Sequence, residues 1–372
     1  MRDFNNLDEL KKLIEDCGVV GAGGAGFPTH KKLDKRAHTL ILNCAECEPL
    51  LSLHSQLLAH FTSEILSALC KVAEMLEAKP IVAIKELFSD TIAAVEQKRQ
   101  QFNNVDIAVL KDFYPAGDEI LLIHEVSGVV VPPGTLPIES GYIVLNVETV
   151  YNIYMAIEYA KPVSHKWLTI AGEVERPTTV HIPVGTSVAE AIKYAGAITT
   201  DKPVYMAGGP MMGRVVASSY EIKKNTNAII VLPAEHKLAQ VTQANVALNR
   251  ASSACCQCRS CTDMCPRFLL GYPIEPHRIM RALAARDASS DAFAGVVYCS
   301  LCGLCEMAAC PQSLSPRSLI KEFKQEIKAQ EKVEASPVAK EISYRRLNSK
   351  RLKMRLGLSK YDLGAPLEVV RT

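Results

Sequence analysis

"GAGGAGFPTHKK", residues 21–32, contains the pattern G-x-G-x-x-G at Gly21, Gly23 and Gly26. This pattern is typical of loops that bind nucleotide phosphates, and the usual loop follows a strand and opens a helix. Here the preceding residues have the apolar spacing of a helix, and Gly18 stands where that helix would end. The pattern is therefore outside its usual context, and the nucleotide must be inferred from the rest of the chain.

Length, charge and hydropathy limit the class of protein. The chain has 372 residues, which is enough for two or three domains and a sizeable core. Its net charge is +2 and it has no long basic block, so nucleic acid is not an expected partner. No apolar run reaches the roughly 18 residues of a membrane-spanning helix. The polar N-terminus does not resemble a signal peptide, so we expect a cytoplasmic protein without disulfides.

Strand-like and helix-like stretches alternate through the first expected domain, which we place at 1–160. The expected strands are short, apolar and separated by longer helical stretches. They lie at 38–43, 80–85, 105–110 and 141–146, and the expected helices lie at 55–77, 88–101, 117–126 and 148–159. This alternation is typical of an α/β domain with a largely parallel sheet.

The pattern of the chain changes twice after this domain. Residues 161–250 contain two strand-like stretches in a hairpin arrangement, one short helical stretch and further strand-like stretches, which indicates a small α+β domain. Residues 251–330 contain cysteines, prolines and short helices. Residues 331–372 are charged, and we expect a solvated tail or linker there.

Thirteen cysteines are a large number for a cytoplasmic chain, and nine of them lie between 255 and 310. Such a cluster favours metal ligands over disulfides. Two runs stand out: C-x2-C-x2-C-x3-C-P at Cys255, Cys258, Cys261, Cys265 and Pro266, and C-x2-C-x2-C-x4-C-P at Cys299, Cys302, Cys305, Cys310 and Pro311. The first run matches bacterial ferredoxins, and the second has one extra residue before its last cysteine.

The two runs predict two [4Fe–4S] clusters. A cubane needs four converging thiolates, and in two-cluster ferredoxins each run supplies three, with the fourth from the other run. We therefore assign one cluster to Cys255, Cys258, Cys261 and Cys310, and the other to Cys299, Cys302, Cys305 and Cys265. Zinc sites and disulfides are the alternatives, but zinc prefers separate C-x2-C pairs. Cys256 is a spare thiol and is expected to be a bystander.

The clusters also bear on the glycine loop. A hydride donor gives two electrons at once, whereas an iron–sulfur cluster accepts one, and a flavin can convert between them. The loop is therefore expected to bind a flavin phosphate through backbone N–H groups that the glycines leave accessible.

The stretch at 21–32 resembles the flavin loop of the NADH-oxidising subunit of respiratory NADH dehydrogenase. It resembles still more the C subunit of the Rnf electron-transport complex and the cobalamin reductase of propanediol-utilisation microcompartments. Further stretches match these families in the same order: "NCAECEP" (43–49), "YPAGDE" (114–119), "VPPGTLP" (131–137) and "NVETVYN" (146–152). Residues 161–235, with "GGPMMG" at 208–213, resemble their soluble-ligand-binding β-grasp (SLBB) domain. The resemblance implies an α/β flavin-binding domain, then a small α+β β-grasp domain, then a helical dicluster ferredoxin-like domain.

The resemblance also implies roles for single residues. In the respiratory subunit the glycine loop and a lysine hold FMN, and an aromatic residue stacks on nicotinamide, which points here to Lys32 and Phe27. One acidic position of the second stretch is Ala45 here, a departure from the pattern. The residues implied to bind FMN or NADH are Gly21, Gly23, Gly24, Gly26, Phe27, Lys32, Asn43, Glu46, Glu48, Tyr114, Gly117, Asp118, Glu119 and Asn146.

Domain order distinguishes the two families that the chain resembles most. The Rnf subunit carries a barrel-like domain before the flavin domain, and the cobalamin reductase carries a comparable domain after the clusters. This chain begins directly at the flavin domain, which favours the cobalamin-reductase type. The resemblance then implies an NADH-dependent reductase that passes electrons through FMN and two [4Fe–4S] clusters to a corrinoid or protein acceptor, inside a microcompartment. The alternative is an electron-entry subunit of an Rnf-type complex, peripheral to the membrane. A binding protein without electron transfer fits less well, because both cysteine runs are intact.

Overall fold

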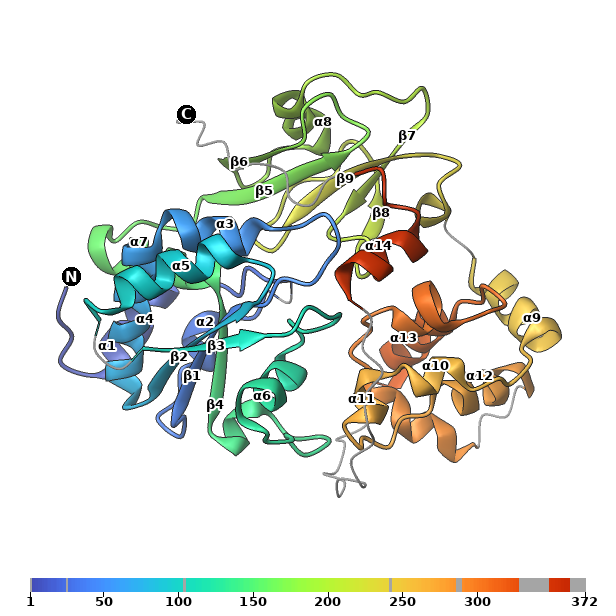
Figure 1. Cartoon of the computed structure of the whole chain (residues 1–372), viewed down its shortest axis with the longest axis horizontal. Coiled ribbons are helices and arrows are strands. Elements are labelled where there is room, and N and C mark those ends of the chain that lie inside the picture. Colours follow the sequence, from blue (N-terminus) through green and yellow to red (C-terminus); the bar gives the residue numbers. More distant parts are fainter. Residues whose placement is uncertain are drawn as a thin grey trace.

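The computed structural model describes residues 2–24, 26–102, 105–240, 243–285, 290–327 and 348–361. Figure 1 shows three regions: an α/β layer at the left, a β-rich region above it and a helical region at the right. They follow one another along the chain in the order that the sequence predicts.

The first region is an α/β domain around a parallel four-stranded sheet of order β3-β2-β1-β4. The strands are β1 (Thr39–Cys44), β2 (Lys79–Lys85), β3 (Asp106–Leu110) and β4 (Tyr142–Asn146), and the helices are α1 (Leu7–Asp16), α2 (Thr29–Lys32), α3 (Leu53–His60), α4 (Thr62–Leu76), α5 (Ser89–Arg99), α6 (Glu119–Ser127) and α7 (Val147–Tyr159). The expected single helix at 55–77 is two helices, because the chain leaves helical geometry at Phe61.

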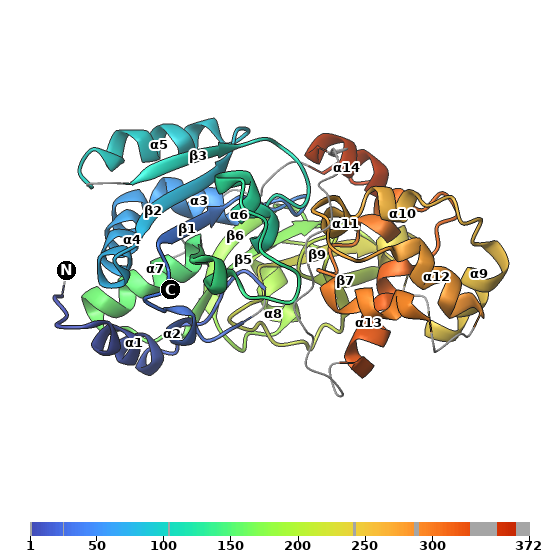
Figure 2. The same ribbon diagram turned by 90° about the horizontal axis from the view of Figure 1, so that it is seen from below.

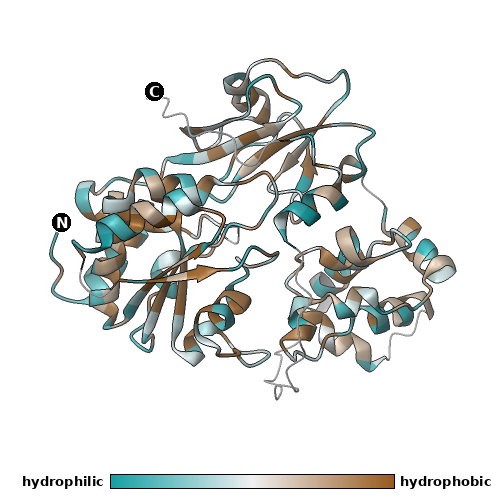
Figure 3. Cartoon of the chain, in the orientation of Figure 1, coloured by the Kyte–Doolittle hydropathy of each residue, from teal (hydrophilic) through white to brown (hydrophobic). Residues whose placement is uncertain are grey.

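Strands β1, β2 and β4 are mostly buried on both faces, as is usual in a parallel sheet, whereas the edge strand β3 exposes Val109. Successive side chains of a strand point to opposite faces, so Leu40 and Leu42 of β1 belong to the core beneath α1, α4 and α7. Ile41 belongs to a second core, which contains α6 and also Leu270 and Ile279 of the helical region. Figure 3 shows the hydrophobic strands between more hydrophilic helix surfaces. The helical region therefore shares a hydrophobic core with the first domain.

The second region is a five-stranded mixed sheet of order β6-β5-β9-β7-β8 with a short helix. Its elements are β5 (His165–Gly172), β6 (Thr178–Pro183), α8 (Val188–Ile192), β7 (Pro203–Ala207), β8 (Arg214–Val216) and β9 (Ala228–Pro233). Strands β5 and β6 form the expected antiparallel hairpin, and β5 pairs in parallel with β9.

The third region is helical and carries both cysteine runs. Its elements are α9 (Ala244–Ala254), α10 (Ser260–Asp263), α11 (Pro266–Leu269), α12 (Pro276–Ala285), a 3₁₀ helix (Asp291–Tyr298), a π-helical turn (Cys305–Ala309) and α13 (Pro316–Ile327). Figure 2, from below, shows this region beside the first domain, with α11 nearest to it. No helix within the described ranges is long and apolar enough to cross a membrane.

One expectation for the C-terminal part is wrong. Residues 331–347 and 362–372 lie outside the described residues, but α14 (Ser349–Leu356) is neither a linker nor a solvated helix. Its Leu352 and Leu356 are fully buried in a core that all three regions share. The basic residues around these leucines conceal the apolar face when composition alone is considered.

Candidate functional site

A cleft opens at the carboxyl ends of β1 and β4. The chain runs from β1 outward to β2 and β3 on one side, whereas β4 lies on the other side of β1, so this is the switch point of the sheet. Ligands of open α/β sheets bind at such points. The cleft is lined by Gly21, Gly23, Phe27, Thr29, Lys32, Asn43, Gly117, Glu119, Val144, Leu145, Asn146 and Thr149.

The glycine loop forms one wall of this cleft. It closes through a hydrogen bond from the Gly21 N–H to the Phe27 carbonyl (2.8 Å), and the Ala22 N–H donates to Thr149 Oγ1 (3.0 Å). A Cβ added at Gly23 would stand 2.3 Å from the Asn146 side chain, so the backbone approaches the N-terminus of α7 more closely than any side chain allows. Position 23 therefore needs glycine because a side chain there would collide with the N-terminus of α7.

Several polar groups in the cleft or beside it lack a hydrogen-bond partner among the described residues. Thr29 Oγ1 is buried and has no hydrogen-bond partner among the described residues. Within the same part of the chain, the Gly23 and Gly24 N–H groups have no acceptor either. Lys32 Nζ lies 2.7 Å from a Glu119 carboxylate oxygen at the rim. Free N–H groups, a hydroxyl and a lysine near a helix N-terminus suit a phosphate-bearing cofactor such as FMN.

Asn43 joins the sheet to the loop opposite. Its amide nitrogen donates to the Gly117 carbonyl (3.0 Å), and its amide oxygen accepts from the Ala45 N–H (3.0 Å). A Cβ at Gly117 would stand 2.7 Å from the Ala45 carbonyl oxygen. The side chain of Asn43 thus fixes the 114–119 loop over the end of β1.

The eight run cysteines line two separate cavities, and each cavity draws on both runs. One is lined by Cys255, Cys258, Cys261 and Cys310, together with Cys256. The other is lined by Cys265, Cys299, Cys302 and Cys305. These are the two ligand sets that the ferredoxin spacing suggests, and we call them the outer set and the inner set.

Four run cysteines around each of two cavities suit two cubanes. Among the described residues no three Cys, His, Asp or Glu side chains meet at one point as the ligands of one metal ion would. A zinc site needs four ligands around one ion. The four thiolates of a cubane bind four different irons, so they surround a volume instead.

The 114–119 loop touches both the cleft and the inner set. Gly117 and Glu119 line the cleft. The Tyr114 hydroxyl donates to the Cys302 carbonyl (2.6 Å), and Asp118 pairs with Arg267 through two contacts of 2.8 and 3.0 Å. Asp118 also caps α6 by accepting from the Leu121 N–H. One short loop therefore places the inner set beside the cleft.

Some residues implied by the resemblance lie elsewhere. Tyr114 and Asp118 hold the inner set rather than line the cleft, and Gly24 and Gly26 shape the glycine loop from outside the lining. Glu46 accepts from the His54 N–H (2.9 Å), and Glu48 accepts from the backbone of the second region. Burial raises the pKa of both carboxyl groups to about 7.

Three residues of these sites were not predicted from the sequence: Thr29, Thr149 and Arg267. The threonines follow the glycine loop and the N-terminus of α7, where hydroxyls often bond to backbone or ligand, so their positions carried a weak signal. Arg267 follows the Cys265–Pro266 pair directly and carried none. Its role depends on the packing of the third region against α6.

The fold and these sites define an electron-transfer flavoprotein with iron–sulfur clusters. The Nuo51 FMN-binding domain matches residues 14–155, the SLBB domain matches 168–215 and the 4Fe-4S dicluster domain matches 254–315. The chain is 37% identical over 366 residues to cobalamin reductase PduS of Citrobacter freundii, which covers 96% of this chain and 81% of that protein. The chain belongs to the cobalamin reductase PduS family.

Two further comparisons are more distant. The C subunit of the ion-translocating oxidoreductase complex of Erwinia tasmaniensis is 31% identical over 278 residues, which are 73% of this chain and 34% of that protein. The crystal structure of an NAD⁺-reducing [NiFe]-hydrogenase in the H₂-reduced state aligns with a TM-score of 0.58 at 19% identity, over 90% of this chain and 64% of that one. The latter likeness shows the fold alone.

Proposed function

We propose that this chain passes electrons from NADH through FMN and two [4Fe–4S] clusters to a corrinoid. The name of its relative, cobalamin reductase, supports the acceptor, and the cleft and cysteine sets support the carriers. FMN supplies the conversion between a two-electron hydride donor and one-electron carriers. A location inside a microcompartment, implied by the family resemblance, is part of this proposal.

Different residues of the cleft are suited to hold FMN and NADH. The Gly23 and Gly24 N–H groups, Thr29 and Lys32 are suited to hold the phosphate. Phe27 lines the cleft with 51% of its surface exposed, so its ring is free to stack on an arriving nicotinamide. Glu119 holds the Lys32 ammonium at the rim and keeps its charge near the phosphate position.

The 114–119 loop is the observation that carries the proposal, because it gives the path an order. Its residues line the cleft and bond to the inner set, so the inner cluster follows the flavin. The outer set includes the exposed Cys258, whereas Cys265 and Cys305 of the inner set are buried. The outer cluster is therefore the exit to the acceptor.

Cysteine variants test this order. Anaerobically purified wild-type protein should hold about eight iron and eight sulfide per chain, and Cys302→Ala and Cys258→Ala should each hold about half. NADH should bleach the flavin in both variants, because neither residue lines the cleft. Cys302→Ala should not reduce its outer cluster, whereas Cys258→Ala should reduce its inner cluster and fail to reduce cobalamin.

The control is Cys256→Ala, which should keep both clusters and full cobalamin reduction. Cobalamin reduction by Cys302→Ala at the wild-type rate would remove the inner cluster from the path. Stoichiometric zinc, with iron near zero after reconstitution, would reject the clusters altogether.

A second candidate function is delivery of electrons to an Rnf-type membrane complex. The 31% identity to the C subunit of an ion-translocating oxidoreductase complex favours it. Binding of the purified protein to membranes that contain the other Rnf subunits, without cobalamin reduction in solution, would favour this candidate.

A further inference from the structure

The turn between β7 and β8, residues 208–213, is held from both sides by charged groups of the other two regions. On one side the Glu48 carboxylate accepts from the Met211 N–H (2.8 Å) and the Met212 N–H (2.9 Å). A Cβ at Gly209 would stand 2.3 Å from this carboxylate. The turn thus rests directly on the first domain.

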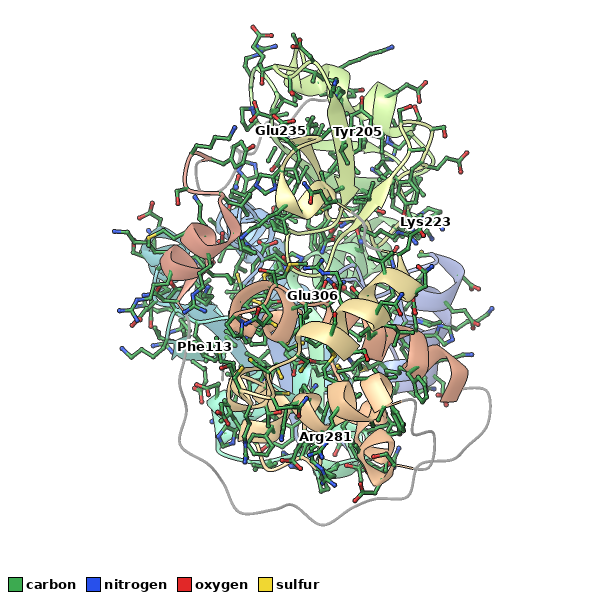
Figure 4. The ribbon with its side chains drawn as sticks, turned by 90° about the vertical axis from the view of Figure 1, so that its right-hand side faces the viewer. Phe113, Tyr205, Lys223, Glu235, Arg281 and Glu306 are labelled. Atoms are coloured by element: carbon green, nitrogen blue, oxygen red, sulfur yellow. The ribbon has the colours of Figure 1, made fainter. Side chains whose placement is uncertain are left out.

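Arg317 holds the same turn from the side of the helical region. Its two terminal nitrogens donate to the Met211 carbonyl (2.8 Å) and the Met212 carbonyl (3.3 Å). Its neighbour Ser318 is fixed in turn, because Glu306 accepts from the Ser318 N–H (2.8 Å) and hydroxyl (3.0 Å). Figure 4 shows Glu306 where the helical region meets the β-rich region. The Arg317 guanidinium therefore has a defined position.

Arg317 also lines the cavity of the inner set, and a Cβ built on Gly303, between Cys302 and Cys305, would stand 3.5 Å from its Cδ. Its Nε is buried and has no hydrogen-bond partner among the described residues. A buried N–H without an acceptor is costly, and the acceptors that a cluster would bring to this cavity are thiolate and sulfide sulfurs. Both the unpaired Nε–H and the cavity are therefore suited to an iron–sulfur cluster.

We propose that Arg317 is a positioning residue that tunes the inner cluster, with its Nε–H donated to a cluster sulfur and its other nitrogens anchored on the turn that Glu48 holds. This inference rests on the proposed function, because it needs a cluster in the inner set. Hydrogen bonds to the sulfurs and nearby charge set the potential of a cluster. A cation that donates to sulfur stabilises the reduced form, which carries one more negative charge.

The test is a redox titration of the inner cluster, followed by electron paramagnetic resonance in a Cys258→Ala background. Arg317→Gln should raise the oxidised-to-reduced ratio at a fixed potential about tenfold, which is about 59 mV for a one-electron couple. Arg317→Lys, which keeps the charge but loses the Nε–H, should shift the ratio less. The matched control is Arg281→Gln, an exposed arginine of the same region that Figure 4 places away from Glu306.

A second variant tests the anchor. Gly209→Ala, whose added Cβ would stand 2.3 Å from the Glu48 carboxylate, disturbs this contact without removing a charge. It should shift the potential in the same direction as Arg317→Gln, and the double variant should shift it no further than Arg317→Gln alone. An unchanged potential in Arg317→Gln, with the inner cluster fully occupied, would overturn the tuning role. Additive shifts in the double variant would overturn the coupling through the turn. Absence of iron from the wild-type protein would instead reject the proposed function.

Discussion

Gly23 is the residue at which the glycine loop tolerates least change. A Cβ there would meet Asn146 at 2.3 Å, whereas a Cβ at Gly21 would stand 3.6 Å from its nearest neighbour, an ordinary contact. Overpacking of this kind costs about 1–3 kcal/mol. Gly23→Ala should therefore weaken FMN binding about 5–150-fold, measured by fluorescence titration of the apoprotein. The matched control is Gly21→Ala. The melting temperature of the apoprotein should fall in Gly23→Ala and stay close to wild type in Gly21→Ala. Equal falls in both variants would contradict a role of space beside α7.

Glu46 makes stability depend on pH. Burial raises its pKa to about 7 from 4.5, against the opposing charges of Lys166 and Lys85. The folded state thus holds this proton more tightly, so its contribution is full below pH 4.5 and is lost as pH rises through 7. The free energy of unfolding in urea should fall over this window, and Glu46→Gln should remove about 2–3 kcal/mol of that decline. Glu48, whose pKa is also about 7, leaves a residual slope in the variant. An unchanged pH profile in Glu46→Gln would show that its carboxyl titrates normally.

Among the secondary-structure elements, α14 packs against all three regions. Ser349 Oγ donates to Asp112 Oδ1 (2.6 Å), and Asp112 also pairs with the buried Lys85 (2.5 Å). Leu352 is fully buried, whereas Met354 on the same helix is 63% exposed. Leu352→Ala should lower the free energy of unfolding by about 2–5 kcal/mol, and Met354→Ala should change it by less than about 0.5 kcal/mol. Urea denaturation distinguishes them, and equal small effects would mean that α14 does not dock in solution.

Across the molecule, the Asp118–Arg267 pair joins the first domain to the helical region. Removing one partner of a buried ion pair costs about 3–5 kcal/mol, because the other charge stays buried. Arg267→Leu should therefore destabilise the protein and slow reduction of the inner cluster after mixing with NADH in stopped flow. Arg278→Leu is the control, since its pairs with Glu275 and Asp291 are exposed and worth little. Wild-type stability in Arg267→Leu would show that the shared core alone holds the two regions together.

Local sequence patterns were enough to predict most secondary-structure elements and the grouping of the run cysteines. Strands β1 to β4, the β5–β6 hairpin and the three-part order follow from apolar periodicity, and the cysteine spacing predicted the two sets that line the two cavities. The strands and the hairpin depend on nearby residues. The cysteine spacing is restricted by the geometry of the loop that carries each run. The break of the helix at Phe61 and the docking of α14 were not predictable, because each depends on contacts with distant parts of the chain.

Tertiary packing decides which residues of the stretches that match the related families face the cleft and which contact another region. Within 114–119, Gly117 and Glu119 face the cleft while Tyr114 and Asp118 face the inner set. Glu48, two residues from Glu46, reaches out of the first domain to hold the turn at 208–213. Spacing along a chain fixes which residues are near one another, but not which neighbouring region packs against each side of a loop. That choice comes from the cores shared between regions, and it brings the cleft, the inner set and Arg317 close to the same loop and turn.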